Sequence, residues 1–218
     1  MSETYRTTRR SLHALGELVL AGPRFRTTGD LRLRVQAAGL STWDAPFVTL
    51  SGADLVAGEH RVGVDGLTYH EVAARVGLVA SPLDDVYGGG PGVHPEEVTR
   101  VDADAAGRVQ EALAVGDAAL RAFRADAERT LWPEHFDVAT TVDGVNFGVS
   151  PGDAYSDEPY AYVGPQEPRA GEFWNAPFGA AQRLDDLGDR AAVTAFFAEG
   201  AGLAAQGGPA IHNQGGTA

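Results

Sequence analysis

The dipeptide Asp143-Gly144 constrains this chain more than any other feature, because it lies between two runs, 135–142 and 145–150, in which apolar and polar residues alternate. Asp-Gly is a preferred two-residue turn between antiparallel strands, since Gly and Asp tolerate the left-handed backbone that this turn requires. The sequence therefore predicts a hairpin. Counting outward from the turn gives its register, which places Asp137 opposite Ser150.

This register divides the hairpin into an apolar face and a polar face, because side chains alternate between the two sides of a sheet. The apolar face, which we expect to lie against the core, carries Phe136, Val138, Val142, Val145, Phe147 and Val149. The polar face carries His135, Asp137, Thr141, Asn146 and Ser150. A slip of one residue would exchange the two faces, so the pattern fixes the register.

The polar face has two interpretations. An antiparallel sheet that meets water on one side shows the same pattern. Alternatively, the face is the floor of a binding pocket, since pockets combine aromatic walls with a few polar groups. Six residues nearby in the sequence supply such groups: Trp132, Glu158, Tyr160, Tyr162, Trp174 and Asn175. Together with Asn146 and Ser150, these six are the predicted ligand-binding residues.

His135 and Asp137 are the candidate catalytic residues, because residues two apart on a strand project from the same face. A carboxylate beside an imidazole can fix the tautomer that a general base needs. The same pair with Glu158 would offer one nitrogen and two carboxylates to a metal ion. Such His-x-Asp pairs also occur by chance, and the sequence predicts no metal site.

The amino-acid composition excludes several kinds of chemistry, because the chain of 218 residues contains no Cys and no Lys. It has no thiol nucleophile, disulfide, thiolate zinc site or iron–sulfur cluster. It also lacks the lysine that anchors pyridoxal phosphate and the lysine of a phosphate-binding loop. The sequence contains no motif typical of serine hydrolases, zinc proteases or dinucleotide-binding folds, so no cofactor is predicted.

The net charge of −13 argues against nucleic acid as a partner, because phosphates require a clustered positive surface. Seven arginines nonetheless lie near the start of the chain: Arg6, Arg9, Arg10, Arg24, Arg26, Arg32 and Arg34. They form either an anion-binding patch or, as is usual for charge runs, a set of solvated side chains that balance the negative charge of the rest of the chain. No run approaches the ~20 apolar residues of a membrane helix, and no export signal is recognised, so we expect no membrane partner and a cytoplasmic location.

Hydrophobic periodicity predicts the remaining elements of secondary structure. Helices are expected near 12–19 and over 104–129 and 186–205. Strands are expected over 31–36, 47–50, 55–57, 60–64 and 160–163. Pro23 and Gly29 predict a turn after the first helix. Thr68 and Glu71 form the pattern of a capping box, which predicts the start of a short helix.

The order of these elements predicts an α+β fold with antiparallel strands and packed helices, rather than alternating parallel units. Residues 1–80 and 104–205 each follow the order helix, three strands, helix, which suggests two pseudo-symmetric halves in one compact unit. A segment rich in Gly and Pro, 81–103, connects the halves. Residues 206–218 are expected to form a flexible tail.

Four blocks of the second half resemble a family of uncharacterised bacterial proteins that is common in actinobacteria. The blocks are LWPEHFDVA at 131–139, NFGVSPGD at 146–153, EPYAYVGP at 158–165 and FWNAPFGA at 173–180. The segment Ala38–Thr42 is similar to an earlier block of the same family. The family is a domain of unknown function, so the resemblance implies a shared architecture and assigns no activity, cofactor or catalytic residue.

Three hypotheses about function follow. The preferred one is a small-molecule-binding domain whose cleft is floored by the hairpin 135–150. The second is an enzyme, cofactor-free or metal-assisted, that uses His135 and Asp137. The third is a structural or interaction module without a ligand. Burial distinguishes them, since a polar face beneath other residues favours the first two and a face open to water favours the third.

Overall fold

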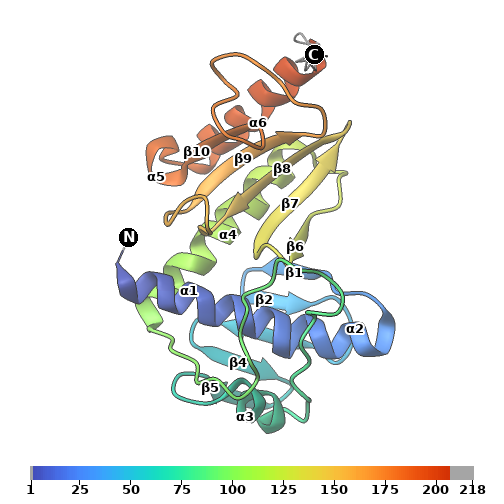
Figure 1. The fold of residues 1–218 in the computed structure, drawn as a ribbon, viewed down its shortest axis with the longest axis vertical. Coiled ribbons are helices and arrows are strands. Elements are labelled where there is room, and N and C mark those ends of the chain that lie inside the picture. Colours follow the sequence, from blue (N-terminus) through green and yellow to red (C-terminus); the bar gives the residue numbers. More distant parts are fainter. Residues whose placement is uncertain (1, 207–218) are drawn as a thin grey trace, which may run out of the picture.

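The computed structural model describes residues 2–206, which fold around one antiparallel sheet with helices packed against it (Figure 1). The predicted α+β class is confirmed. The predicted tail lies outside the described residues, except for Gln206.

Along the chain, two runs of five consecutive strands are separated and flanked by helices. The helices are α1 (Glu3–Leu15), a π-helical segment η1 (Gly16–Ala21), α2 (Gly22–Thr28), α3 (Tyr69–Arg75), α4 (Ala103–Phe123), α5 (Leu184–Leu187) and α6 (Arg190–Ala205). The strands of the first half are β1 (Leu33–Gln36), β2 (Gly39–Thr42), β3 (Val48–Ser51), β4 (Asp54–Ala57) and β5 (His60–Gly63). Those of the second half are β6 (Thr130–Trp132), β7 (Asp137–Val142), β8 (Val145–Ser150), β9 (Tyr160–Pro165) and β10 (Ala180–Arg183).

Each half contributes five consecutive strands, and the halves join where β1 lies beside β6. The strand order is β10-β9-β8-β7-β6-β1-β2-β3-β4-β5, and every neighbouring pair is antiparallel. The expected strand segments correspond to four strands of the first half and three of the second, so the sequence missed β2, β6 and β10. These strands have only three or four residues, and β2 is buried along its whole length, so they carry too little alternation to be recognised.

One face of this sheet is apolar from end to end. Its register aligns Leu33, Leu131, Val138 and Val149 on that face. A Cβ atom at Gly16 would lie 3.9 Å from Leu33, so the helix of the first half packs on this face, and α4 of the second half packs on Val138 and Val149. Neighbouring strands of a sheet are rotated relative to one another, so the two ends of a ten-stranded sheet face in different directions. Accordingly, α1 and α2 lie in front of the lower strands in Figure 1, whereas α4 and α6 lie behind the upper ones.

The helical predictions need three corrections. The first helix continues through Pro23 to Thr28, because Pro near the start of α2 lacks only an N–H that the helix does not need, and Gly29, with φ of 74°, ends it. The long helix α4 ends at Phe123 instead of 129, where Arg124 takes an extended backbone. The last helix is divided in two at Gly188, whose φ is 85°.

Two local predictions are confirmed. The Thr68 hydroxyl accepts a hydrogen bond from the Glu71 N–H (3.1 Å), and the Glu71 carboxylate accepts one from the Thr68 N–H (2.8 Å), which is a complete capping box. The hairpin of β7 and β8 has the predicted register, with Val142 opposite Val145. Its turn residues have the positive φ angles that an Asp-Gly turn requires.

A glycine at the contact between α4 and the hairpin gives the first testable prediction. A Cβ atom at Gly116 would lie 2.6 Å from Val149 Cβ and 2.7 Å from Val138 Cγ1. Gly116→Ala should therefore lower the free energy of unfolding by about 1–3 kcal/mol through overpacking. Gly107→Ala is the matched control, because a Cβ there meets nothing within 4 Å, and it should stabilise α4 by about 0.5–1 kcal/mol. Equal denaturation midpoints for the two variants would show that α4 does not lie on the hairpin.

Candidate functional site

The face of β6–β10 opposite α4 and α6, called the open face below, carries three rows of side chains across the strands. The first row, from β6 to β10, is Trp132, Asp137, Ser150, Tyr160 and Arg183. The second is Thr130, Ala139, Gly148, Tyr162 and Ala181. The third includes Thr141, Asn146 and Gly164. The register therefore places four members of the predicted polar face, Asp137, Thr141, Asn146 and Ser150, on one side of the sheet.

Gly148 determines how the second row is filled. A Cβ atom at this position would lie 2.5 Å from both Cζ and Oη of Tyr162, so the phenol ring lies directly across the backbone of β8. A glycine inside a strand often marks such a close approach. The ring thereby reaches from β9 to β7, where the Tyr162 hydroxyl donates a hydrogen bond to Asp137 Oδ2.

Asp137 is a buried carboxyl group with incomplete hydrogen bonding. The residue is only 6% exposed, and its Oδ1 atom is buried without a hydrogen-bond partner. Burial raises the pKa of Asp137 to about 6, although the hydrogen bond from Tyr162 acts in the opposite direction. Burial, followed by the negative charge of Asp137, also raises the pKa of Tyr162 well above its usual value. A buried acceptor without a donor costs about 1–3 kcal/mol, and more when it is charged, so such a group calls for an explanation.

A second pair of the same kind lies beside the first. The Tyr160 hydroxyl donates to Asp153 Oδ2 at 2.6 Å, and the Ser150 hydroxyl approaches the same oxygen at 3.4 Å. Ser150 in turn accepts a hydrogen bond from the Gly152 N–H at 3.1 Å. Burial raises the pKa of Tyr160 as well, and the hydrogen bond to Asp153 adds to this effect. We call Asp137, Asp153, Tyr160 and Tyr162 the Asp–Tyr cluster.

Exposed aromatic side chains flank the Asp–Tyr cluster. The rings of Tyr155 and Phe178 lie 4.9 Å apart, and they contact Tyr160 at 5.3 Å and Tyr162 at 6.2 Å, respectively. Tyr155 is 47% exposed and Phe178 is 37% exposed. On the other side, Trp132 pairs with Asp137 in the sheet and is 39% exposed. The buried carboxylate of Asp137 and the partly buried one of Asp153 therefore lie beside aromatic groups that reach the surface.

The prediction that His135 and Asp137 project from one strand face is wrong. His135 lies in the turn before β7, where its exposed ring is 3.8 Å from the Glu134 carboxylate. Phe136, with φ of 54°, interrupts the extended backbone, so the two-residue alternation does not extend beyond Asp137. Phe136 is buried as predicted, but it stacks on His13 of α1 instead of continuing the strand. The hydrogen-bond partner of Asp137 is Tyr162.

Three further predicted residues serve other contacts. Glu158 forms an ion pair with Arg183 of β10, and residues 2–206 contain no group of three His, Asp or Glu side chains that could hold a metal ion. Trp174 packs on Phe173 at 4.9 Å and against the core. Asn175 binds both backbone groups of Ala181, at 2.9 and 3.1 Å, and so holds the start of β10. The proposed metal ligands are therefore not brought together, and only Phe178 of the Phe173–Gly179 loop reaches the Asp–Tyr cluster.

Sequence reasoning missed Gly148, Asp153, Tyr155 and Phe178. The isolated glycine in an alternating strand was a usable signal, since it marks a close approach of another group. Asp153 follows Ser-Pro-Gly, and its carboxylate accepts hydrogen bonds from the N–H groups two and three residues later, as in an Asx turn. Nothing in the local sequence indicated that Tyr155 and Phe178 would meet.

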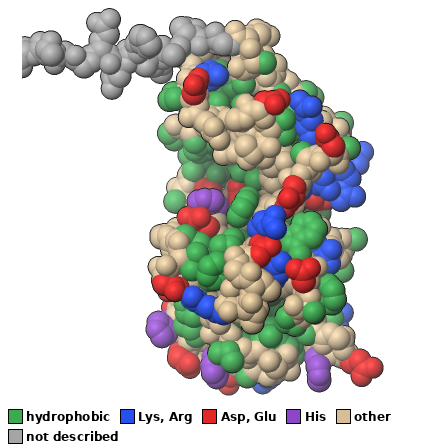
Figure 2. All heavy atoms as spheres, turned by 90° about the vertical axis from the view of Figure 1, so that its right-hand side faces the viewer, with side chains coloured by type: hydrophobic (Ala, Val, Ile, Leu, Met, Phe, Trp, Pro, Cys, Tyr) green, Lys and Arg blue, Asp and Glu red, His purple; other side chains and the backbone are tan. Residues whose placement is uncertain are grey.

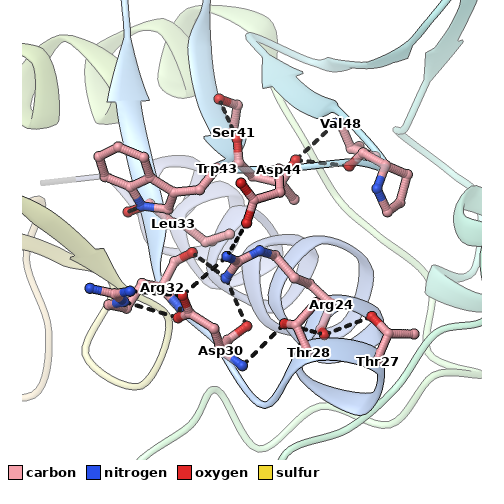
Figure 3. Close-up of polar contacts among 12 residues, drawn as sticks. Arg24, Thr27, Thr28, Asp30, Arg32, Leu33, Ser41, Trp43, Asp44 and Val48 are labelled. Atoms are coloured by element: carbon pink, nitrogen blue, oxygen red, sulfur yellow. Dashed lines mark hydrogen bonds and ion pairs between the residues drawn. The ribbon is translucent and has the colours of Figure 1, made fainter.

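Six of the seven arginines near the start of the chain are paired with acidic residues, and the seventh, Arg34, donates to the Ser41 hydroxyl and lies over the Trp43 ring. Arg24 is buried and donates to the carboxylates of Asp44 (2.8 Å) and Asp30 (3.1 Å) and to the Asp30 carbonyl (2.8 Å), as the close-up shows (Figure 3). Arg26 is paired with Asp85. On the face seen in Figure 2, acidic and basic side chains lie next to one another instead of forming separate patches. Of the two interpretations, the structure favours arginines that balance the charge of acidic residues over an anion-binding patch.

No protein-family model, no curated protein and no solved structure matches the chain. The resemblance to an uncharacterised actinobacterial family therefore stays a prediction. No helix within residues 2–206 is both long enough and apolar enough to cross a membrane.

The raised pKa of Asp137 predicts a pH-dependent stability. In the unfolded chain this carboxyl ionises near pH 3.8, and in the folded protein near pH 6, so its ionisation opposes folding as the pH rises between these values. The penalty is absent below the unfolded pKa and complete above the folded one, where it reaches about 3 kcal/mol. Relative to wild type, Asp137→Asn should therefore gain about 3 kcal/mol of stability between about pH 4 and pH 7. Urea denaturation across this range measures the difference, and a constant difference would contradict the assignment.

Proposed function

We propose that this protein binds a small molecule at the open face of its second half, with Asp137 as the anchoring residue. One observation carries the proposal: Asp137 Oδ1 is buried without a donor while Oδ2 is held by Tyr162. A ligand N–H group would supply the missing donor. Unsatisfied polar groups and perturbed carboxyl groups are concentrated at functional sites, which supports this interpretation over a merely hydrated strand face.

The charge of the site favours a cationic ligand. Two carboxylates, Asp137 and Asp153, lie in one cluster, and burial raises the pKa of Asp137 because it disfavours the ionised form. A positive ligand would stabilise the ionised carboxylate. The exposed rings of Trp132, Tyr155 and Phe178 would add cation–π attraction for an ammonium group. The net charge of −13 also raises the local concentration of cations.

The chain's own cations near this face already have anionic or carbonyl partners. Arg183, in the same row as Asp137, is paired with Glu158. Arg9 of α1 donates to the Asp157 carbonyl at 3.1 Å, and its guanidinium lies against Gly152. We therefore infer that the ligand is an organic ammonium compound, small enough to reach a carboxylate beneath one layer of side chains.

A second candidate function is acid–base catalysis by Asp137. A carboxyl group with a pKa of about 6 exchanges protons near neutral pH more effectively than an ordinary aspartate. In this version Asp137 is the catalytic group and Tyr162 positions it, whereas His135, exposed in its turn, acts on Asp137 only through its charge. Chemical conversion of a bound ammonium ligand would favour the enzyme over the binding domain.

The test is an NMR titration with benzylammonium as the probe and benzoate as its anionic counterpart. Wild type should bind benzylammonium and not benzoate, with shifts confined to the open face. Asp137→Asn should weaken binding at least tenfold, about 1.4 kcal/mol, because it removes the charge and keeps the shape. Glu59→Gln is the matched control, since it removes one exposed negative charge in the turn between β4 and β5.

Glu59→Gln should bind the probe as wild type does. Equal affinity of Asp137→Asn and Glu59→Gln would show that the probe senses only net charge, and the proposal would fail. The absence of shifts on the open face with either probe would favour the module without a ligand.

A further inference from the structure

A cavity of 490 Å³ lies at the other end of the same hairpin, away from Asp137. It is enclosed by the turn between β7 and β8, the segment that follows β9, and the last turn of α6. Its volume is within the range of about 300–1,000 Å³ that is usual for small-molecule sites. None of its lining residues belongs to the Asp–Tyr cluster, so this cavity is separate from the site proposed above.

The floor of the cavity is apolar. Val142, Val145 and Phe147 of the hairpin face Ala201 and Ala204 of α6 across it. Phe147 is fully buried and packs on Phe123 at 4.7 Å, so the floor is continuous with the core between the helices and the sheet. Such a surface suits the apolar body of a ligand.

The rim carries charges of both signs. Arg124 lies 3.8 Å from the Asp143 carboxylate across the hairpin turn. Arg169, whose side chain is largely buried, donates to Glu167 at 3.3 Å and to the Ala204 carbonyl at 3.4 Å. Its Nε is buried without a hydrogen-bond partner. The Nε–H group of Arg169 is therefore a donor without an acceptor, and the hydrogen bond from the guanidinium to the Ala204 carbonyl is long.

We propose that this cavity binds a small zwitterion with an apolar side chain, namely an apolar amino acid. The carboxylate would bind the Arg169 guanidinium, whose planar donors match it in pairs. The ammonium would bind near Asp143 or Glu167, and near the last carbonyls of α6, where the helix dipole is negative. The rim offers charges of both signs, so a ligand of one sign could pair with only half of them, which is why a zwitterion fits best.

The experiment is an NMR titration of the full chain with phenylalanine and two relatives that each lack one charge. N-acetylphenylalanine lacks the ammonium, and phenylalaninamide lacks the carboxylate. Measured from the shifts of residues that line the cavity, phenylalanine should bind at least tenfold more tightly than either relative, and Arg169→Gln should weaken its binding to the level of phenylalaninamide. Asp137→Asn should leave the affinity for phenylalanine unchanged, so failure here and failure at the open face are distinguishable.

A cavity-filling variant provides an independent check. Gly202 lines the cavity on α6, and a Cβ there meets nothing within 4 Å, so Gly202→Leu should fill the space without disturbing the fold and should abolish binding. Gly107→Leu on α4, where a Cβ atom also meets nothing within 4 Å, is the matched control and should retain binding. Equal affinities for all three compounds, unchanged affinity in Gly202→Leu, or no binding by wild type would each overturn the proposal.

Discussion

A single apolar face shared by all ten strands is the constraint on which the rest of the structure depends. The pairing of Leu33 with Leu131 joins the two halves at the centre of the sheet, and the register carries this face outward to Val138 and Val149. Because η1, α4 and α6 pack against that face, the opposite side is left to polar and aromatic residues. The register of the hairpin, fixed by its buried side, therefore also decides which groups meet on the open face.

On that open face, the absence of a side chain at Gly148 determines the chemistry. It allows the Tyr162 ring to lie across β8 and reach Asp137, which sits among neighbours that exclude water. Two effects on the carboxyl then compete: burial favours the neutral form, and the Tyr162 hydrogen bond favours the ionised form. Burial prevails, since the pKa of Asp137 is raised to about 6. A cation with an N–H donor would reverse this balance, which is the physical basis for the proposed ligand.

Features determined by neighbouring residues in the chain could be predicted from the sequence. The Asp143-Gly144 turn, the hairpin register and the capping box at Thr68 each depend on a few adjacent residues, and the structure confirms them. His135 was misplaced because alternation was extended past Asp137, whereas the positive φ of Phe136 reverses the chain there. The short strands β2, β6 and β10 were missed because their pairing partners, and not their own patterns, make them strands.

The candidate site could be predicted only in part, for a similar reason. Asp137, Ser150, Tyr160 and Tyr162 follow from alternation along three strands. The aromatic groups around them come from loops, and Phe178 reaches Tyr155 from more than twenty residues away along the chain. No periodicity reports such a contact, so neither the flanking rings nor the role of Asp153 could be derived.

The central claim is that Asp137 is a buried carboxyl whose charge lacks a partner in the folded protein. The most direct measurement is a ¹³C NMR titration of the Asp137 side-chain carboxyl, assigned by its loss in Asp137→Asn. Wild type should titrate with a midpoint near pH 6, and Tyr162→Phe with a higher midpoint, because the hydrogen bond to the ionised form is removed. A midpoint near the usual value of about 3.9 for aspartate, unchanged in Tyr162→Phe, would contradict the claim.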